Sequence, residues 1–184
     1  MTDDEVVERL LLGIDAYDRD GGLVYDEIFR EVHDRIASNG DAGKIDIAAI
    51  AVWKRSAQGA WTGPLLGRPE AEVRAATSQA FSAEDDRAAL GSLAVLPGYE
   101  RQEALPTALL CAYDPVRYAV MDRRALAALA SLGLGVGRTR GMTLRYLAQV
   151  RELRDQLADV RPGTTARDVD KGLFMVGEGL VLRR

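Results

Sequence analysis

Residues 90–130 read LGSLAVLPGYERQEALPTALLCAYDPVRYAVMDRRALAALA. Apolar residues follow the three- and four-residue spacing of helices on both sides of a Leu-Pro-Gly turn at 96–98, here called the LPG turn. A short extended segment then leads to Asp122, which opens a third helix. Aspartate is favoured at a helix N-terminus because its carboxylate accepts a hydrogen bond from a free backbone N–H. The stretch therefore predicts three helices joined by two short connections.

Helical periodicity also dominates the rest of the chain. The run RYAVM at 117–121 is too short to build a sheet, and the Gly- and Pro-rich residues 56–69 predict a loop. We predict an all-α protein of about nine helices in a single domain, in which residues 1–44 form N-terminal helices and residues 45–184 the core. The predicted helices cover about residues 2–14, 23–37, 45–53, 69–81, 82–96, 103–113, 122–133, 143–160 and 165–179.

Composition excludes several classes of protein and of site. The chain has 184 residues, of which 47% are hydrophobic and 28% charged, as in ordinary globular domains. Its single cysteine, Cys111, excludes a disulfide framework and a cysteine-rich metal site, and its single histidine excludes a His-pair metal site. That histidine, His33, lies among charged residues and is predicted to be solvated. We expect no cofactor, no metal and no membrane partner, and a reduced, cytoplasmic location.

Charge is unevenly distributed along the chain. Residues 1–116 carry 21 acids and 11 bases, whereas residues 117–184 carry 13 bases and 7 acids. Nearly all the bases are arginines, and the only lysines are Lys44, Lys54 and Lys171. An arginine-rich half is what a phosphate-binding surface requires, because the guanidinium pairs with phosphate through two parallel hydrogen bonds. A GC-rich genome explains the arginines equally well.

The run GLGVGRTRG at 133–141 has the glycine content of a phosphate-binding loop. It lacks the Lys-Ser/Thr ending of a nucleotide P-loop, and no strand precedes it, so a helix–helix connection is the simpler prediction. The same run still offers backbone amides and two arginines, Arg138 and Arg140, to a phosphate.

The order of elements around the LPG turn and Asp122 resembles the helix-hairpin-helix superfamily of base-excision DNA glycosylases. More particularly, residues 45–178 resemble a group of uncharacterised bacterial proteins with the 8-oxoguanine DNA glycosylase fold. The shared features are the pair Trp53-Lys54, the helix ending in Asp114-Pro115, the run Tyr118-x-Val120-x-Asp122-x-Arg124, and the late segment Arg167 to Lys171.

By this resemblance Asp122 is the catalytic carboxylate. Base excision leaves a positively charged sugar, which a fixed carboxylate stabilises and to which it directs a water. The alternative is that Asp122 only caps a helix, which contributes about 1 kcal/mol and needs no other purpose. The two roles are compatible.

Two departures from the family pattern limit the predicted activity. Bifunctional members carry a lysine near the start of the helix after the hairpin, where this chain has Gln102, Glu103, Ala104 and Leu105. The resemblance therefore implies a monofunctional glycosylase at most. The hairpin also reads Leu-Pro-Gly-Tyr-Glu in place of Leu-Pro-Gly-Val-Gly, so the acid at Glu100 weakens phosphate binding at Gly98.

The remaining candidates for DNA or substrate contact each have an ordinary structural alternative. Lys54 is either a phosphate contact or nucleophile, or a favourable charge at a helix C-terminus. The others are Arg123 and Arg124 after Asp122, and Arg167, Asp170 and Phe174, which the resemblance places at a base pocket and which otherwise form an ion-pair face and core.

Three functions remain open. The first is a protein of glycosylase fold that binds double-stranded DNA, associates with the nucleoid and excises a modified base with Asp122. The second is a catalytically inactive descendant that acts as a binding or regulatory module. The third is a helical bundle with no nucleic-acid role.

Overall fold

The computed structural model describes residues 1–19, 26–54, 59–101 and 103–179, and these contain ten helices and no strand. The predicted all-α class is confirmed. Residues 118–121 are extended backbone, as the short RYAVM run suggested, but they pair with no other strand in the described residues. No helix in this part of the chain is long and apolar enough to cross a membrane.

The chain folds into two compact units. Unit 1 combines residues 1–24 with residues 115–184, and unit 2 consists of residues 25–114. The boundary suggested between residues 44 and 45 therefore falls inside unit 2, between two helices that pack on each other, α3 (Glu27–Asn39) and α4 (Lys44–Trp53). Of the predicted helix at 23–37, residues 23–25 lie outside the described residues.

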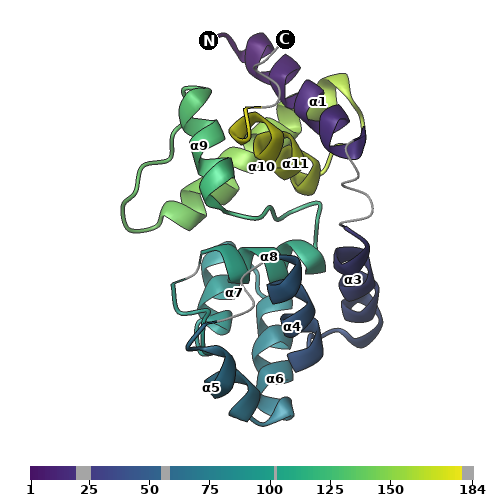
Figure 1. The fold of residues 1–184 in the computed structure, drawn as a ribbon, viewed down its shortest axis with the longest axis vertical. Coiled ribbons are helices and arrows are strands. Elements are labelled where there is room, and N and C mark those ends of the chain that lie inside the picture. Colours follow the sequence, from purple (N-terminus) through teal and green to yellow (C-terminus); the bar gives the residue numbers. More distant parts are fainter. Residues whose placement is uncertain (20–25, 55–58, 102, 180–184) are drawn as a thin grey trace. The chain divides into compact units, whose positions relative to one another are not determined.

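Unit 1 is built around its last helix, α11 (Ala166–Gly177), as Figure 1 shows. The helix packs against α1 (Asp3–Arg19), α9 (Arg123–Ser131) and α10 (Met142–Val160). Contact with α1 is closest at two glycines, because a Cβ on Gly13 would lie 2.7 Å from the carbonyl oxygen of Gly172. The two ends of the sequence are thus held together by a crossing that only glycine permits.

In unit 2 the most buried helix is α8 (Ala104–Tyr113), whose residues from Leu105 to Ala112 are all buried. It packs against α3, α4 and α7 (Asp86–Leu93). The α3 residue His33 is half-buried, and its Nδ1 lies 2.7 Å from the carbonyl oxygen of Ala112 in the last turn of α8. The prediction of a solvated His33 is therefore wrong: its ring joins two helices of the unit 2 core.

Helix starts differ from the prediction where the local signal was ambiguous. Residues within the expected loop at 56–69 form a short helix, α5 (Thr62–Gly67), and α6 (Glu70–Phe81) follows it. The N-cap of α7 is Asp85, whose carboxylate accepts from the Ala88 amide at 2.8 Å, and not Ser82. The N-cap of α11 is Thr165, as predicted, in a reciprocal capping box with Asp168.

Candidate nucleic-acid interface

Asp122 stands at the junction of a buried segment and a helix. The preceding residues, from Tyr118 to Met121, are at most 2% exposed, and the Tyr146 hydroxyl of α10 donates to the Val120 carbonyl at 3.0 Å. Asp122 itself is half-buried, and its Oδ1 accepts from the Ala125 amide at 2.9 Å, so it is the N-cap of α9. Its backbone is thus held firmly, and the helix N-terminus favours a negative charge there.

The two arginines after Asp122 differ in their surroundings. Arg123 is exposed. Arg124 is paired instead: its Nε lies 2.6 Å from a Glu178 carboxylate oxygen, and its guanidinium covers the ring of Phe174 at 4.7 Å. The predicted base-pocket residue Phe174 therefore stacks against a guanidinium from its own unit, which leaves Arg123 as the better candidate for DNA contact.

Arg167 and Asp170 lie inside unit 1. They are 7% and 4% exposed and form an ion pair, and the Arg167 Nη2 also donates to the Tyr17 hydroxyl of α1 at 3.1 Å. A buried charge must be paired in this way to offset the loss of hydration. Both side chains therefore join α1 to α11, and their prediction as substrate-binding residues is not supported.

Residues 133–141, the basic loop, are organised by an arginine outside the loop. The Arg145 guanidinium on α10 donates to the carbonyl oxygens of residues 136 and 140 at 2.8 and 2.9 Å. It also reaches the carbonyl oxygens of residues 137 and 139 at 3.3 Å, and the Thr139 hydroxyl at 2.8 Å. One side chain thus fixes the path of a loop that contains three glycines with positive φ.

This arrangement determines where the loop amides point. In a trans peptide the carbonyl and the N–H of the next residue point in opposite directions, and the described residues contain no cis peptide. Because the carbonyls of residues 136, 137, 139 and 140 face Arg145, the amides of residues 137, 138, 140 and 141 face away from it. None of these four amides donates a hydrogen bond within the described part of the chain.

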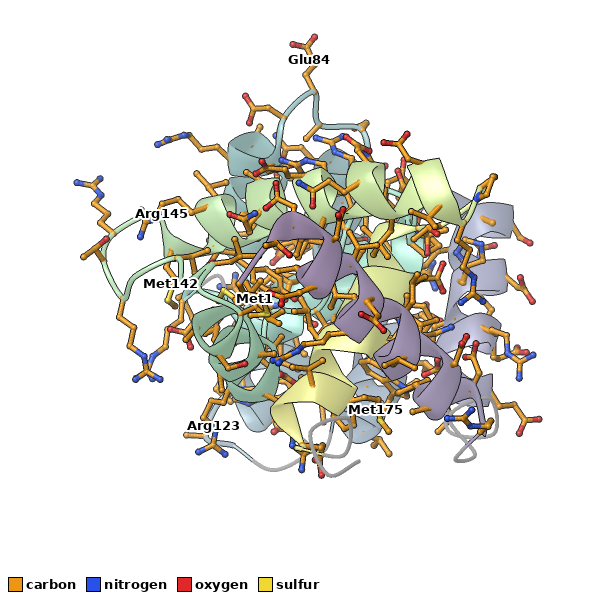
Figure 2. The ribbon with its side chains drawn as sticks, turned by 90° about the horizontal axis from the view of Figure 1, so that it is seen from above. Met1, Glu84, Arg123, Met142, Arg145 and Met175 are labelled. Carbon is orange, nitrogen blue, oxygen red and sulfur yellow. The ribbon has the colours of Figure 1, made fainter. Side chains whose placement is uncertain are left out.

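The basic loop also carries exposed positive charge. Arg138 and Arg140 are both exposed, and no carboxylate in the described residues pairs with either guanidinium. In Figure 2 the labelled Met142 and Arg145 lie on the same side of unit 1 as Arg123. The loop runs back along α9, so that α10 begins level with the start of α9 (Figure 1). Outward amides, arginines and two helix N-termini together favour an anion.

At the LPG turn the donors are already used. Gly98 has φ +89°, and its amide donates to a carboxylate oxygen of Glu100 at 2.9 Å. A Cβ on Gly98 would lie 2.6 Å from the Trp61 ring, which covers the turn. The next residue, Tyr99, is fully buried, and this burial raises the pKa of its hydroxyl. The predicted phosphate contact at Gly98 thus has an internal carboxylate in the place of the phosphate.

Neither of the two lysines considered for chemistry adjoins Asp122 in the sequence. Lys54 is the C-cap of α4 in unit 2, where a positive charge is favourable. Lys171, on α11, lies 3.3 Å from Asp168 and 3.6 Å from Asp18. Burial opposes ionisation of Asp168, but its bonds to Thr165 and the Lys171 charge outweigh burial and lower its pKa. The described residues hold no cluster of three His, Cys, Asp or Glu side chains that suits a metal.

Two features of the interface were missed in the sequence. Arg145 gave no signal, because the carbonyl oxygens that it binds depend on the path of the loop. Glu100 was read only as a repulsive charge, although an acid two residues after a glycine is placed to accept from that glycine's amide.

Comparison with known proteins gave no match: no family model, no curated protein and no solved structure is similar to this chain. The glycosylase resemblance therefore remains a prediction. It rests on the sequence around Asp122 and on the geometry of unit 1.

Proposed function

We propose that this protein binds DNA through the basic surface of unit 1 and excises a modified base with Asp122. The observation that carries DNA binding is the basic loop, where four outward amides and two unpaired arginines project from one side of the unit. Backbone amides and arginines are the groups that contact DNA phosphates without reading sequence. Arg123, exposed at the start of α9, extends the positive charge toward Asp122.

Base excision is supported by the way Asp122 is held. The buried segment before it and the N-cap bond after it fix its backbone, while its side chain remains partly accessible. A fixed carboxylate is what the positively charged sugar of the transition state requires. With no lysine between Lys54 and Lys171, strand cleavage through a Schiff base has no nucleophile near the LPG turn, so the activity proposed is monofunctional.

The test is excision from a panel of duplexes that each contain one modified base, such as 8-oxoguanine, uracil or an alkylated purine. A monofunctional glycosylase yields strand breaks only after alkali treatment of the abasic site. We expect Asp122→Asn to lower excision by at least about 100-fold. Asparagine caps helices as well as aspartate does, so the variant should fold normally. Asp85→Asn, which changes the N-cap of α7, is the matched control and should keep full activity.

One observation favours a second candidate function, a catalytically inactive binding or regulatory module of the same fold. The Gly98 amide is occupied by Glu100, so the LPG turn has lost its capacity to anchor phosphate. If the wild-type protein binds duplex DNA but excises none of the bases in the panel, this second function holds. If it does not bind DNA at all, the protein is a helical bundle with no nucleic-acid role.

A further inference from the structure

The helix α4 in unit 2 has the composition of a buried helix but lies partly in solvent. Its sequence, KIDIAAIAVW, has no charged residue between Asp46, which is 1% exposed, and its C-cap Lys54. One side packs into the core through Ile47 and Ile50, both fully buried. A helix that is apolar all round is normally covered on every side.

The uncovered side of α4 forms an apolar stripe. Ile45 is 73% exposed and Val52 is 56% exposed, seven residues apart, with Ala49 between them. Positions i, i+4 and i+7 share one face of a helix, and a stripe with this spacing is the kind that packs against another helix. No described element of unit 2 covers it to that extent.

A groove runs between this stripe and α3. It has a volume of about 370 Å³ and an apolar floor and wall formed by Val32, Ile28, Ile45 and Ala49. The buried Asp46 carboxylate also lines the groove, but it is neutralised by the Arg35 Nε at 2.6 Å. The Asp46 hydrogen bond and charge accordingly raise the pKa of Arg35.

The charge that remains at the rim is negative. Glu27 and Glu31 line the groove from α3, both are exposed, and neither forms an ion pair in the described residues. They lie four residues apart and therefore on the same side of the helix, one turn from each other. This rim repels nucleic acid and anionic lipid headgroups, so the occupant must be apolar with positive flanks.

We propose that the α3–α4 groove binds an amphipathic helix of a partner protein, which inserts aliphatic side chains between Ile28 and Ile45 and places two basic residues, one turn apart, opposite Glu27 and Glu31. The helix-in-groove mode matches an apolar stripe at i, i+4 and i+7. The charge pairs then set the orientation of the helix and exclude acidic competitors. This surface lies in unit 2 and does not depend on DNA binding by unit 1.

The test uses two fluorescein-labelled helical peptides of about 18 residues, long enough for five turns. Both carry leucines at i, i+4 and i+7 of an alanine-rich sequence, and they differ in having arginine or glutamate at two flanking positions one turn apart. Fluorescence anisotropy measures binding to the full-length protein. The arginine peptide should bind at least about tenfold more tightly than its acidic twin, because it alone pairs with the rim.

Variants at exposed positions complete the test, since they leave the core of unit 2 intact. Ile45→Glu should abolish binding of the arginine peptide, and Glu27→Arg combined with Glu31→Arg should reverse the preference between the two peptides. Val95→Glu, a change at a similarly exposed apolar residue outside the groove, should have no effect.

Three results would overturn the proposal. The first is equal binding of both peptides, or binding that survives Ile45→Glu. The second is the absence of binding by the arginine peptide to the wild-type protein. The third is a concentration-dependent dimer in sedimentation that Ile45→Glu disrupts, because the groove would then be filled by a second copy of this chain.

Discussion

The basic loop of unit 1 and the LPG turn of unit 2 both place glycines of positive φ ahead of a helix, and they use their backbone donors in opposite ways. In the basic loop the Arg145 side chain takes the carbonyls, so the amides face outward beside Arg138 and Arg140. In the LPG turn the Glu100 carboxylate takes the Gly98 amide, and Trp61 covers the glycine.

This contrast shows that glycine content does not identify a phosphate site. An anion binds where amides and cations remain unpaired, and the neighbouring side chains decide whether they do. The sequence pattern favoured the LPG turn as part of a DNA-binding hairpin, whereas the free donors lie in the basic loop. Each prediction below changes one of the two turns.

The largest effect is expected from Gly98→Ala. A side chain there must adopt a φ of +89° and place its Cβ 2.6 Å from the Trp61 ring. We expect the free energy of unfolding to fall by about 3 kcal/mol. Gly137→Ala in the basic loop is the matched control: it has a φ of +66° and no atom within 4 Å, so about 1 kcal/mol is expected. Urea unfolding followed by circular dichroism measures both, and equal losses would contradict the contrast.

The next effect concerns Arg145→Ala. Without the guanidinium the carbonyls of the basic loop lose their shared partner, and the loop opens more often. Trypsin, which cuts after arginine, should then cleave at Arg138 or Arg140 about tenfold faster than in the wild-type protein. Arg161→Ala, at the other end of α10, removes an exposed arginine paired with Asp15 and should leave this rate unchanged. An unchanged rate in Arg145→Ala would mean that the loop does not need its brace.

The smallest effect is expected from Glu100→Gln. The amide oxygen of glutamine still accepts from Gly98, so the turn keeps its shape while one negative charge is lost. Duplex DNA affinity should rise by less than about threefold, because an exposed charge outside the interface acts only at long range. A rise of tenfold or more, measured by anisotropy at low salt, would place the LPG turn inside the DNA interface.

Most helices could be predicted from the sequence because their signals are local. The caps at Asp122 and Thr165 involve residues three positions apart, and apolar spacing marks each buried face. The helix α5 was missed because its six residues, TGPLLG, are too few to show a period. The division into two units depends on contacts between α1 and α11, which local patterns do not encode.

The candidate site could be predicted only in part. Asp122, Arg123, Arg138 and Arg140 were identified by residue type and position, and the structure leaves the three arginines exposed. Arg167 and Asp170 were predicted at a substrate pocket because their spacing suggests a polar helix face, but α1 covers that face and supplies Tyr17. A helix surface can be read from the sequence, whereas the element that packs on it is a tertiary property.

The most direct test of the central claim is the salt dependence of duplex DNA binding, because each phosphate contact adds a fixed increment to the slope of log affinity against log salt. For the wild-type protein we predict a steep slope. Replacement of both Arg138 and Arg140 by alanine should reduce it by about two and weaken binding at low salt by at least about tenfold. Replacement of Arg87 and Arg101, two exposed arginines of unit 2, should leave the slope unchanged. Equal slopes for the two double variants and the wild type would contradict the account.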